Sequence, residues 1–190
     1  DGVPSPEALA ARAADLGISA LALTDHDALY GAVRFVKAAR DAGVKPILGS
    51  EVTLRGSKPA DDTHLTLLVE TAEGYANLCR LITLARRDQS KEVARLDKSD
   101  LAAHAGGLIA LSGCRRGEIP RLLLARKREQ ALGVARGYAR VFGPGRFFIE
   151  LHRHYTKGDN RLVARLTTLA DRAGLDVVAT GNAHYLHPHQ

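Results

Sequence analysis

The sequence predicts an α/β fold in which a parallel sheet curves into a barrel with its helices outside. Short apolar runs bounded by glycine, proline or charge alternate with amphipathic segments of helical period, which is the pattern of parallel strands joined by crossover helices. Polar residues of catalytic types follow one apolar run after another, and chemistry in such barrels gathers at the carboxyl ends of the strands. No phosphate-binding glycine fingerprint follows any strand, which argues against a doubly wound nucleotide-binding sheet.

The expected elements alternate along the whole chain. Ser5 caps and Pro6 opens a predicted helix that Gly17 ends, and Asp97 is the predicted cap of a later helix. Strands are expected over residues 18–24, 46–51, 64–69, 108–112, 147–151 and 177–180, and further helices over residues 28–42, 73–88, 98–105, 119–124, 129–142 and 159–173. These strands, with at least one more expected beyond an end of the sequence, favour a barrel over an open sheet.

Length and composition predict one compact domain over residues 1–190. The chain is 45% hydrophobic and has no linker-like stretch. It has no apolar stretch long enough to span a bilayer and no leader, so we expect no membrane partner and a cytoplasmic location. The absence of Met predicts a piece of a longer chain. The net charge of +6 suits an anionic partner such as DNA, although scattered basic residues fit a solvated surface equally well.

An acid–imidazole–acid cluster, Asp25, His26 and Asp27, closely follows the apolar run over residues 18–23. A run this apolar predicts a strand that is covered on both faces. Two carboxylates beside an imidazole repel each other and lose hydration when partly buried, so they need a cation or many hydrogen-bond donors to stay charged. A divalent metal is the simplest such cation.

Residues of metal-ligand types end the other predicted strands as well: Glu51, Cys114, His152, His154, Asn182 and His184. His64 instead begins its strand, and it reaches the same end of the sheet only if the chain turns after Glu51 and returns antiparallel, which is a hypothesis. Taken singly, each residue has a simpler explanation: a hydrogen-bonded histidine, a small buried cysteine, or a glutamate that caps a helix or pairs with arginine. Their coincidence at strand after strand favours a metal site.

The donor types predict the metal and the chemistry. Imidazole, carboxylate and one thiolate together suit Zn, Mn or Fe, whereas Mg and Ca prefer oxygen ligands alone. Carboxylates can bridge two ions, and paired ions are the usual device for phosphoester hydrolysis. Arg115 and Arg116 are candidates to hold a phosphate group, although a solvated pair of loop arginines is equally expected.

Several blocks of the sequence resemble the PHP (polymerase and histidinol phosphatase) domain. They are Thr24-Asp25-His26-Asp27 with Leu29-Tyr30-Gly31, Gly49-Ser50-Glu51, His64-Leu65-Thr66-Leu67-Leu68, Leu111-Ser112-Gly113-Cys114, Ile149-Glu150-Leu151 and Thr180-Gly181-Asn182-Ala183-His184-Tyr185. The stretch over residues 74–78 and the block over residues 111–117 are more narrowly similar to the PHP domain of bacterial C-family DNA polymerases, the alpha subunit of DNA polymerase III and its error-prone relative. The resemblance covers nearly the whole chain.

The resemblance implies a distorted seven-stranded βα barrel, similar to a TIM barrel, that lacks its first strand in this sequence. It also implies up to three metal ions at the barrel mouth, with ligands at Asp1, His26, Glu51, His64, Cys114, Asn182 and His184. Asp25, His26 and Glu51 are the expected catalytic residues, and Asp25 and Asp27 belong to the motif without being expected as direct ligands. The family's opening His-x-His is absent, and Asn182 stands where the family has an Asp, which can bridge ions as an amide cannot.

The resemblance is compatible with two main functions. The first is a metal-dependent phosphoesterase within a replicative or error-prone polymerase, acting as a 3′–5′ exonuclease or on pyrophosphate. The second is a degenerate scaffold that braces the polymerase and docks a proofreading or clamp-associated subunit; a free-standing phosphatase is least expected. The expected partners are DNA, the remaining polymerase domains and such a subunit. The retained His, Glu and Cys residues favour the first function, and Asn182 favours the second.

Overall fold

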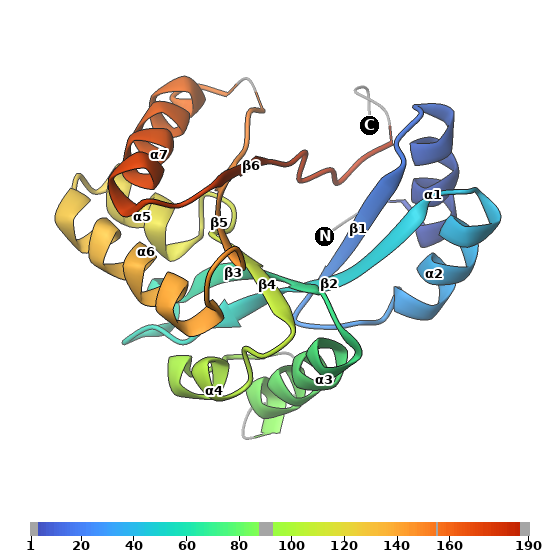
Figure 1. Ribbon diagram of the computed structural model, residues 1–190, viewed down its shortest axis with the longest axis horizontal. Helices are drawn as coiled ribbons and strands as arrows, with labels where there is room; N and C mark the ends of the chain where they lie inside the picture. The colour runs from blue at the N-terminus through green and yellow to red at the C-terminus, as the bar shows by residue number, and fades with distance from the viewer. Residues whose placement is uncertain (1–3, 88–92, 155, 187–190) are drawn as a thin grey trace.

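The computed structural model describes residues 4–87, 93–154 and 156–186 and shows a six-stranded sheet that curls into half a barrel (Figure 1). The strands are β1 (Ala20–His26), β2 (Lys45–Leu54), β3 (Thr63–Val69), β4 (Leu108–Leu111), β5 (Phe147–Leu151) and β6 (Val177–Ala179), and they lie in this order across the sheet. β1 and β2 are parallel, as are the neighbours β4 and β5 and the neighbours β5 and β6. β3 runs antiparallel to both β2 and β4.

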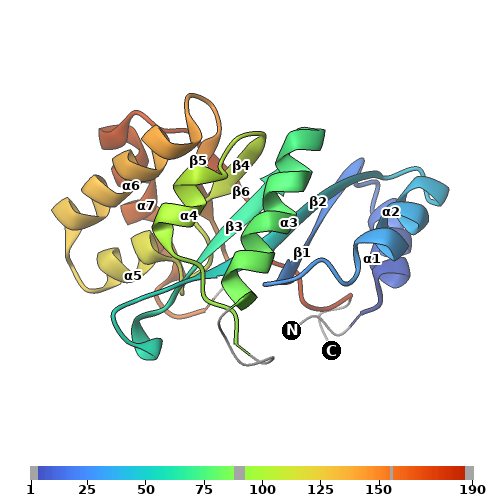
Figure 2. The ribbon, with the colours of Figure 1, turned by 90° about the horizontal axis from the view of Figure 1, so that it is seen from below.

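Helices cover the outer face of the curled sheet (Figures 1 and 2). They are α1 (Pro6–Asp15), α2 (Ala32–Asp41), α3 (Ala72–Arg87), α4 (Lys98–Ala103), α5 (Glu118–Leu124), α6 (Arg128–Phe142) and α7 (Asp159–Ala173), and a short 3-10 turn, η1 (Pro59–Asp61), precedes β3. α1 and α2 pack beside β1 and β2, α3 packs across β2, β3 and β4, and α6 and α7 pack against β5. None of the described helices is long and apolar enough to cross a membrane.

The alternation of side chains along β2 and β3 separates the core from the inner face of the sheet. Val52, Leu54, Leu65 and Leu67 are at most 1% exposed and belong to the large core cluster under the helices. Since successive side chains of a strand point to opposite faces, the residues between them line the inner face. The packed leucines therefore give the inner face of these two strands a rigid base.

Helix ends follow local sequence signals in part. Ser5 caps α1 as predicted, because its Oγ accepts a hydrogen bond from the backbone N–H of Ala8 at 3.3 Å. Asp97 occupies the N-cap position of α4 as predicted, but its side chain makes no capping hydrogen bond to the helix. Its carboxylate instead accepts a hydrogen bond from Nε of Arg55 at 2.8 Å, because a charged donor offers a stronger bond than a helix N–H group.

Three expectations about the sheet need correction. The pattern is not parallel throughout, because β3 returns antiparallel; this return is the one proposed for His64, and it is confirmed. β1 is not covered on both faces but is only partly buried, and among the described strands it pairs with β2 alone. The described residues build six strands, so the predicted seven-stranded TIM-like barrel is not confirmed.

Candidate metal centre

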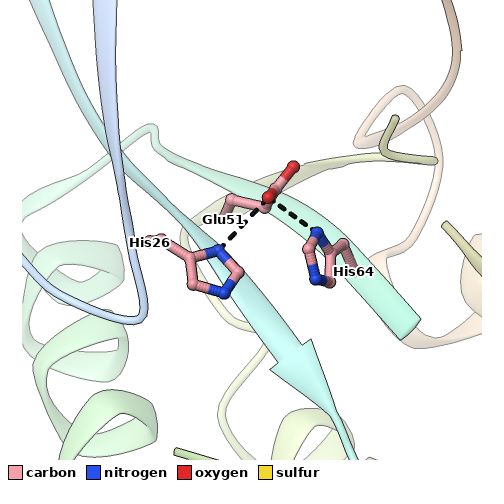
Figure 3. Close-up of side chains that lie close together, drawn as sticks. All are labelled: His26, Glu51 and His64. Atoms are coloured by element: carbon pink, nitrogen blue, oxygen red, sulfur yellow. Dashed lines mark hydrogen bonds and ion pairs between the residues drawn. The ribbon is translucent and has the colours of Figure 1, made fainter. Parts of the chain in front are cut away.

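Three side chains of metal-ligand type converge on the inner face of β1, β2 and β3 (Figure 3). In the strand register His26 lies opposite Glu51, and Thr53 lies opposite His64. Glu51 and Thr53 are two residues apart and so share a face, which places both histidines on that same face. Glu51 Oε1 lies 3.2 Å from His26 Nδ1 and 2.7 Å from His64 Nδ1.

The hydrogen bonds around Glu51 favour an ionised carboxylate between two imidazoles. Burial raises the pKa of Glu51, but the hydrogen bonds from His26 and His64 outweigh it and hold the pKa well below its ordinary value. The hydrogen bond to Glu51 raises the pKa of His26, with a further contribution from the charge of Asp27. The centres of the two imidazole rings lie 4.7 Å apart, and both rings contact the same oxygen of Glu51.

One ring nitrogen of His64 is the clearest candidate metal-ligand atom in the cluster. It is 4% exposed, and its Nε2 is buried without a hydrogen-bond partner among the described residues. A buried polar atom without a partner costs about 1–3 kcal/mol. Cys114 lies beside it, with Sγ 3.8 Å from His64 Nδ1. Burial and the nearby charge of Glu51 raise the pKa of the Cys114 thiol to about 11, so this thiol stays protonated at neutral pH unless a cation is bound to it.

The donor set fits a metal ion of the Zn, Mn or Fe class. The candidate ligand atoms of His26, Glu51 and His64 all lie within 4.8 Å of one another. Ligand atoms that bind one zinc ion at about 2.1 Å are roughly 3.4 Å apart, so small side-chain rotations bring these three into range. Two imidazoles, a carboxylate and an adjacent thiol are also the ligand types that such ions prefer.

The carboxylates of Asp25 and Asp27 accept hydrogen bonds from backbone N–H groups. Asp25 Oδ2 accepts a hydrogen bond from the N–H of Gly31 at 2.7 Å. Asp27 is 7% exposed and accepts from both the N–H and the hydroxyl of Thr53, at 2.7 and 2.8 Å. Asp27 Oδ2 and the Thr53 hydroxyl also lie 3.3 and 3.2 Å from His26 Nε2, so they fix the ring whose Nδ1 faces Glu51.

Comparison with known families and chains identifies the domain. The family model described as the PHP domain matches residues 1–154 of the chain. The chain belongs to the PHP domain family. It is 44% identical to the error-prone DNA polymerase of Symbiobacterium thermophilum over 97% of its length, and 35% identical to the DNA polymerase III subunit alpha of Borreliella burgdorferi over 98%. It is also 39% identical to the DNA polymerase III subunit alpha of Thermus aquaticus over 88%. The resemblance to C-family polymerase PHP domains is thus confirmed.

These relatives are much longer than this PHP domain, which spans 18%, 17% and 14% of the three polymerases. Two solved structures share its fold. A protein described as a metal-dependent phosphoesterase from Bifidobacterium adolescentis superimposes with a TM-score of 0.63, 15% identity and coverage of 100% of this chain and 85% of that chain. An amidohydrolase from Chromobacterium violaceum gives a TM-score of 0.58, 18% identity and coverage of 99% and 84%.

Two other predicted metal ligands of this PHP domain, Asn182 and His184, lie outside the three-residue cluster. Asp1 is outside the described residues. Asn182 and His184 follow β6, where His184 Nδ1 bonds the backbone oxygen of Asn182 at 2.9 Å, and neither is within the group formed by His26, Glu51 and His64. Both stay predictions as metal ligands.

The two arginines predicted to hold phosphate differ in their surroundings. Arg115 donates to Oδ1 of Asp159 at 2.8 Å, so its charge is already compensated. Asp159 also accepts from the backbone N–H groups of His154 and Thr156, and it thereby fixes the loop between β5 and α7. Arg116 is exposed and makes no hydrogen bond through its guanidinium to any described residue, and its charge lowers the pKa of nearby His26. Arg116 is therefore the freer cation of the two.

A second buried polar cluster was not anticipated from the sequence. Glu150 Oε1 accepts the Thr180 hydroxyl at 2.6 Å and lies 3.0 Å from His152 Nε2, which is 2.7 Å from the Thr180 hydroxyl. Glu150 is 5% exposed, and its Oε2 has no partner among the described residues. The signal was a charged residue inside the apolar strand over residues 147–151, which is rare unless the charge is paired. The cluster ties the start of the segment that carries Asn182 and His184 to β5.

Proposed function

We propose that this PHP domain is a metal-dependent phosphoesterase within a bacterial DNA polymerase of the DNA polymerase III alpha type. The observation that carries the proposal is the convergence of His26, Glu51 and His64 on one inner face, with the Cys114 thiol beside them. The similarity to polymerases along nearly the whole chain and the fold shared with a metal-dependent phosphoesterase both support it. The proposed substrates are a DNA 3′ end, in a 3′–5′ exonuclease reaction, or pyrophosphate.

The proposed metal ligands in the described chain are His26, Glu51, His64 and Cys114. Asp1, Asn182 and His184 are proposed to extend this set to as many as three ions of Zn, Mn or Fe. When bound, such ions lower the pKa of a water molecule and stabilise negative charge on a phosphate group.

The chain's own side chains have separate roles at this site. Glu51 keeps a negative charge between the two imidazoles, and Asp27 with Thr53 holds the His26 ring in position. Asp25 acts through the turn that it fixes at Gly31. Arg116 is placed to pair with a phosphate oxygen, because it is exposed, lies close enough to His26 to affect its pKa, and has no carboxylate partner in the described chain.

A seventh strand is proposed to complete the barrel between β6 and β1. These two strands are the ends of the sheet, and each pairs on one side only among the described strands. Figure 1 shows both ends on the side of the molecule where the sheet stays open. Unpaired strand edges leave backbone N–H and C=O groups without partners, and a strand bonded to both would satisfy them.

The alternative function is a scaffold that braces the polymerase and docks a proofreading or clamp-associated subunit. Asn182 supports it, because an amide oxygen binds metal more weakly than the carboxylate of the family pattern. In both functions DNA and the remaining polymerase domains are the proposed partners.

Hydrolysis assays separate the two functions. The full-length protein that the gene encodes is incubated with Mn or Zn and with either 3′-labelled single-stranded DNA or pyrophosphate. The phosphoesterase proposal predicts release of label or of phosphate that Glu51→Gln abolishes and that His104→Asn, a histidine outside the site, leaves unchanged. Absence of both activities in a folded, metal-loaded protein would support the scaffold instead.

A further inference from the structure

A groove on the outer, helical side of the molecule is built differently from the metal centre. It lies among α5, α6 and α7, whose arrangement Figures 1 and 2 show, and has a volume of about 250 Å³. α7 lines it with a stripe at helical spacing: Arg161, Ala164, Arg165, Thr168, Leu169 and Arg172. Leu123 of α5 and Leu132 of α6 join Leu169 as a buried apolar floor, each less than 7% exposed.

The rim of the groove is strongly basic. Four arginines line it, at positions 128, 161, 165 and 172, and none of its described lining residues is acidic. Arg172 pairs with the exposed carboxylate of Glu129, and Arg165 donates to the backbone oxygen of Leu123 at 3.0 Å. The guanidinium groups of Arg128 and Arg161 make no hydrogen bond or ion pair with any described residue. Like charges gathered at one site repel, so the groove attracts anionic groups.

The chemistry of the groove limits what can bind there. Single-stranded nucleic acid is held by basic grooves that carry aromatic side chains for base stacking, and no described lining residue of this groove is aromatic. Pockets for whole small-molecule ligands have volumes of roughly 300–1,000 Å³, so this one suits one or two apolar side chains of a larger partner. An apolar floor inside a basic rim fits apolar anchors flanked by carboxylates.

We propose that this groove docks an acidic peptide segment of a separate protein, with leucine-type side chains on the floor and Asp or Glu at the arginines. A separate protein is the source because charge at the rim of an interface mainly steers partners that arrive by diffusion, whereas permanent interfaces are more hydrophobic. The binding mode is that of an amphipathic helix in a groove. This docking function is independent of the proposed phosphoesterase activity.

Peptide selection tests the proposal. A library of random 16-residue peptides displayed on phage is selected on the immobilised full-length protein, and the enriched peptides are measured by fluorescence anisotropy. Expected are sequences rich in Asp and Glu around Leu, Ile or Phe, whose affinity falls as NaCl is raised. The double variant Arg128→Glu and Arg161→Glu is expected to weaken binding at least tenfold.

Two further variants separate the groove from general charge effects. Arg140→Glu makes one such charge reversal in α6 but lies about 18 Å along the helix from Arg128, and it is expected to leave affinity unchanged. Thr168→Trp fills the exposed groove without changing its charge and is expected to abolish binding, which keeps the test valid if the double variant fails to fold.

Any of three results with the peptides would overturn the proposal. These are enriched peptides without acidic residues, equal binding to the folded groove variants, or no peptide that binds more tightly than about 100 µM. A single-stranded oligonucleotide that competes at the groove as strongly as the best peptide would also overturn it, since that result would assign the site to nucleic acid.

Discussion

Replacing Asp27 tests its structural role, which is to accept hydrogen bonds from Thr53 beside the metal centre. Its carboxylate accepts two hydrogen bonds from Thr53, and its φ of 50° lies in the left-handed region. In Asp27→Ala the buried Thr53 N–H loses its partner, which costs about 2 kcal/mol. An alanine in the left-handed region costs about 1 kcal/mol more. The Thr53 hydroxyl can still bond His26 Nε2, so we add nothing for it.

The expected loss for Asp27→Ala is therefore about 3 kcal/mol in the free energy of unfolding, measured by urea denaturation. Asp27→Asn keeps an acceptor for the Thr53 N–H and tolerates the left-handed region, so its loss is about 1 kcal/mol. Asp15→Ala, at an exposed position near the end of α1, is the control and stays within about 0.5 kcal/mol. A loss below about 1 kcal/mol for Asp27→Ala, or equal losses for the Ala and Asn variants, would refute the reasoning.

Three further variants test other parts of the structure. Thr180→Val removes the hydroxyl that bonds Glu150, so hydrogen exchange over residues 180–186 should speed up; unchanged exchange would contradict the role given to this cluster. Gly31→Ala places a Cβ 2.7 Å from Cδ2 of Leu23 and should lower the free energy of unfolding by about 1–3 kcal/mol. Gly133→Ala, in open space within α6, should raise it by about 0.5–1 kcal/mol. A change of the same sign in both variants would argue against the packing described. Hydrogen bonds from the side chain and backbone of Thr156 lower the pKa of Asp159 from 3.8 to about 2. The ionised carboxylate therefore stabilises the fold fully above pH 3.8, and this stabilisation is lost as the pH falls towards 2. Asp159→Asn should flatten this part of the acid denaturation curve, and an unchanged slope would contradict the assignment.

The sequence was most informative where a local pattern determines the structure. Helix and strand positions follow the apolar period, and the antiparallel return of His64 could be inferred from the polar loop after Glu51. The convergence of His26, Glu51 and His64 follows from the order and register of the strands, so it can be predicted once the strand order is known.

Contacts between side chains that are far apart in the chain could not be predicted from the sequence. Arg115 pairs with Asp159, which lies 44 residues further along the chain, and no local sequence pattern predicts this ion pair. The Asp27–Thr53 contact likewise depends on the exact register of β1 and β2. The six strands were expected from the sequence, but the alternation of elements does not determine which edges of a sheet meet, so closure into the predicted barrel could not be derived from it.

The metal content of the purified protein tests the central claim most directly. Plasma mass spectrometry on the full-length protein, after exposure to Zn, Mn and Fe and removal of excess ions, is expected to give at least one bound ion per chain. Binding should fall in His26→Asn and Glu51→Gln and remain in His104→Asn, whose histidine ends α4 away from the cluster. A folded protein that binds none of these ions, or one whose metal content is the same in all three variants, would contradict the assignment of His26, Glu51 and His64 as a metal centre.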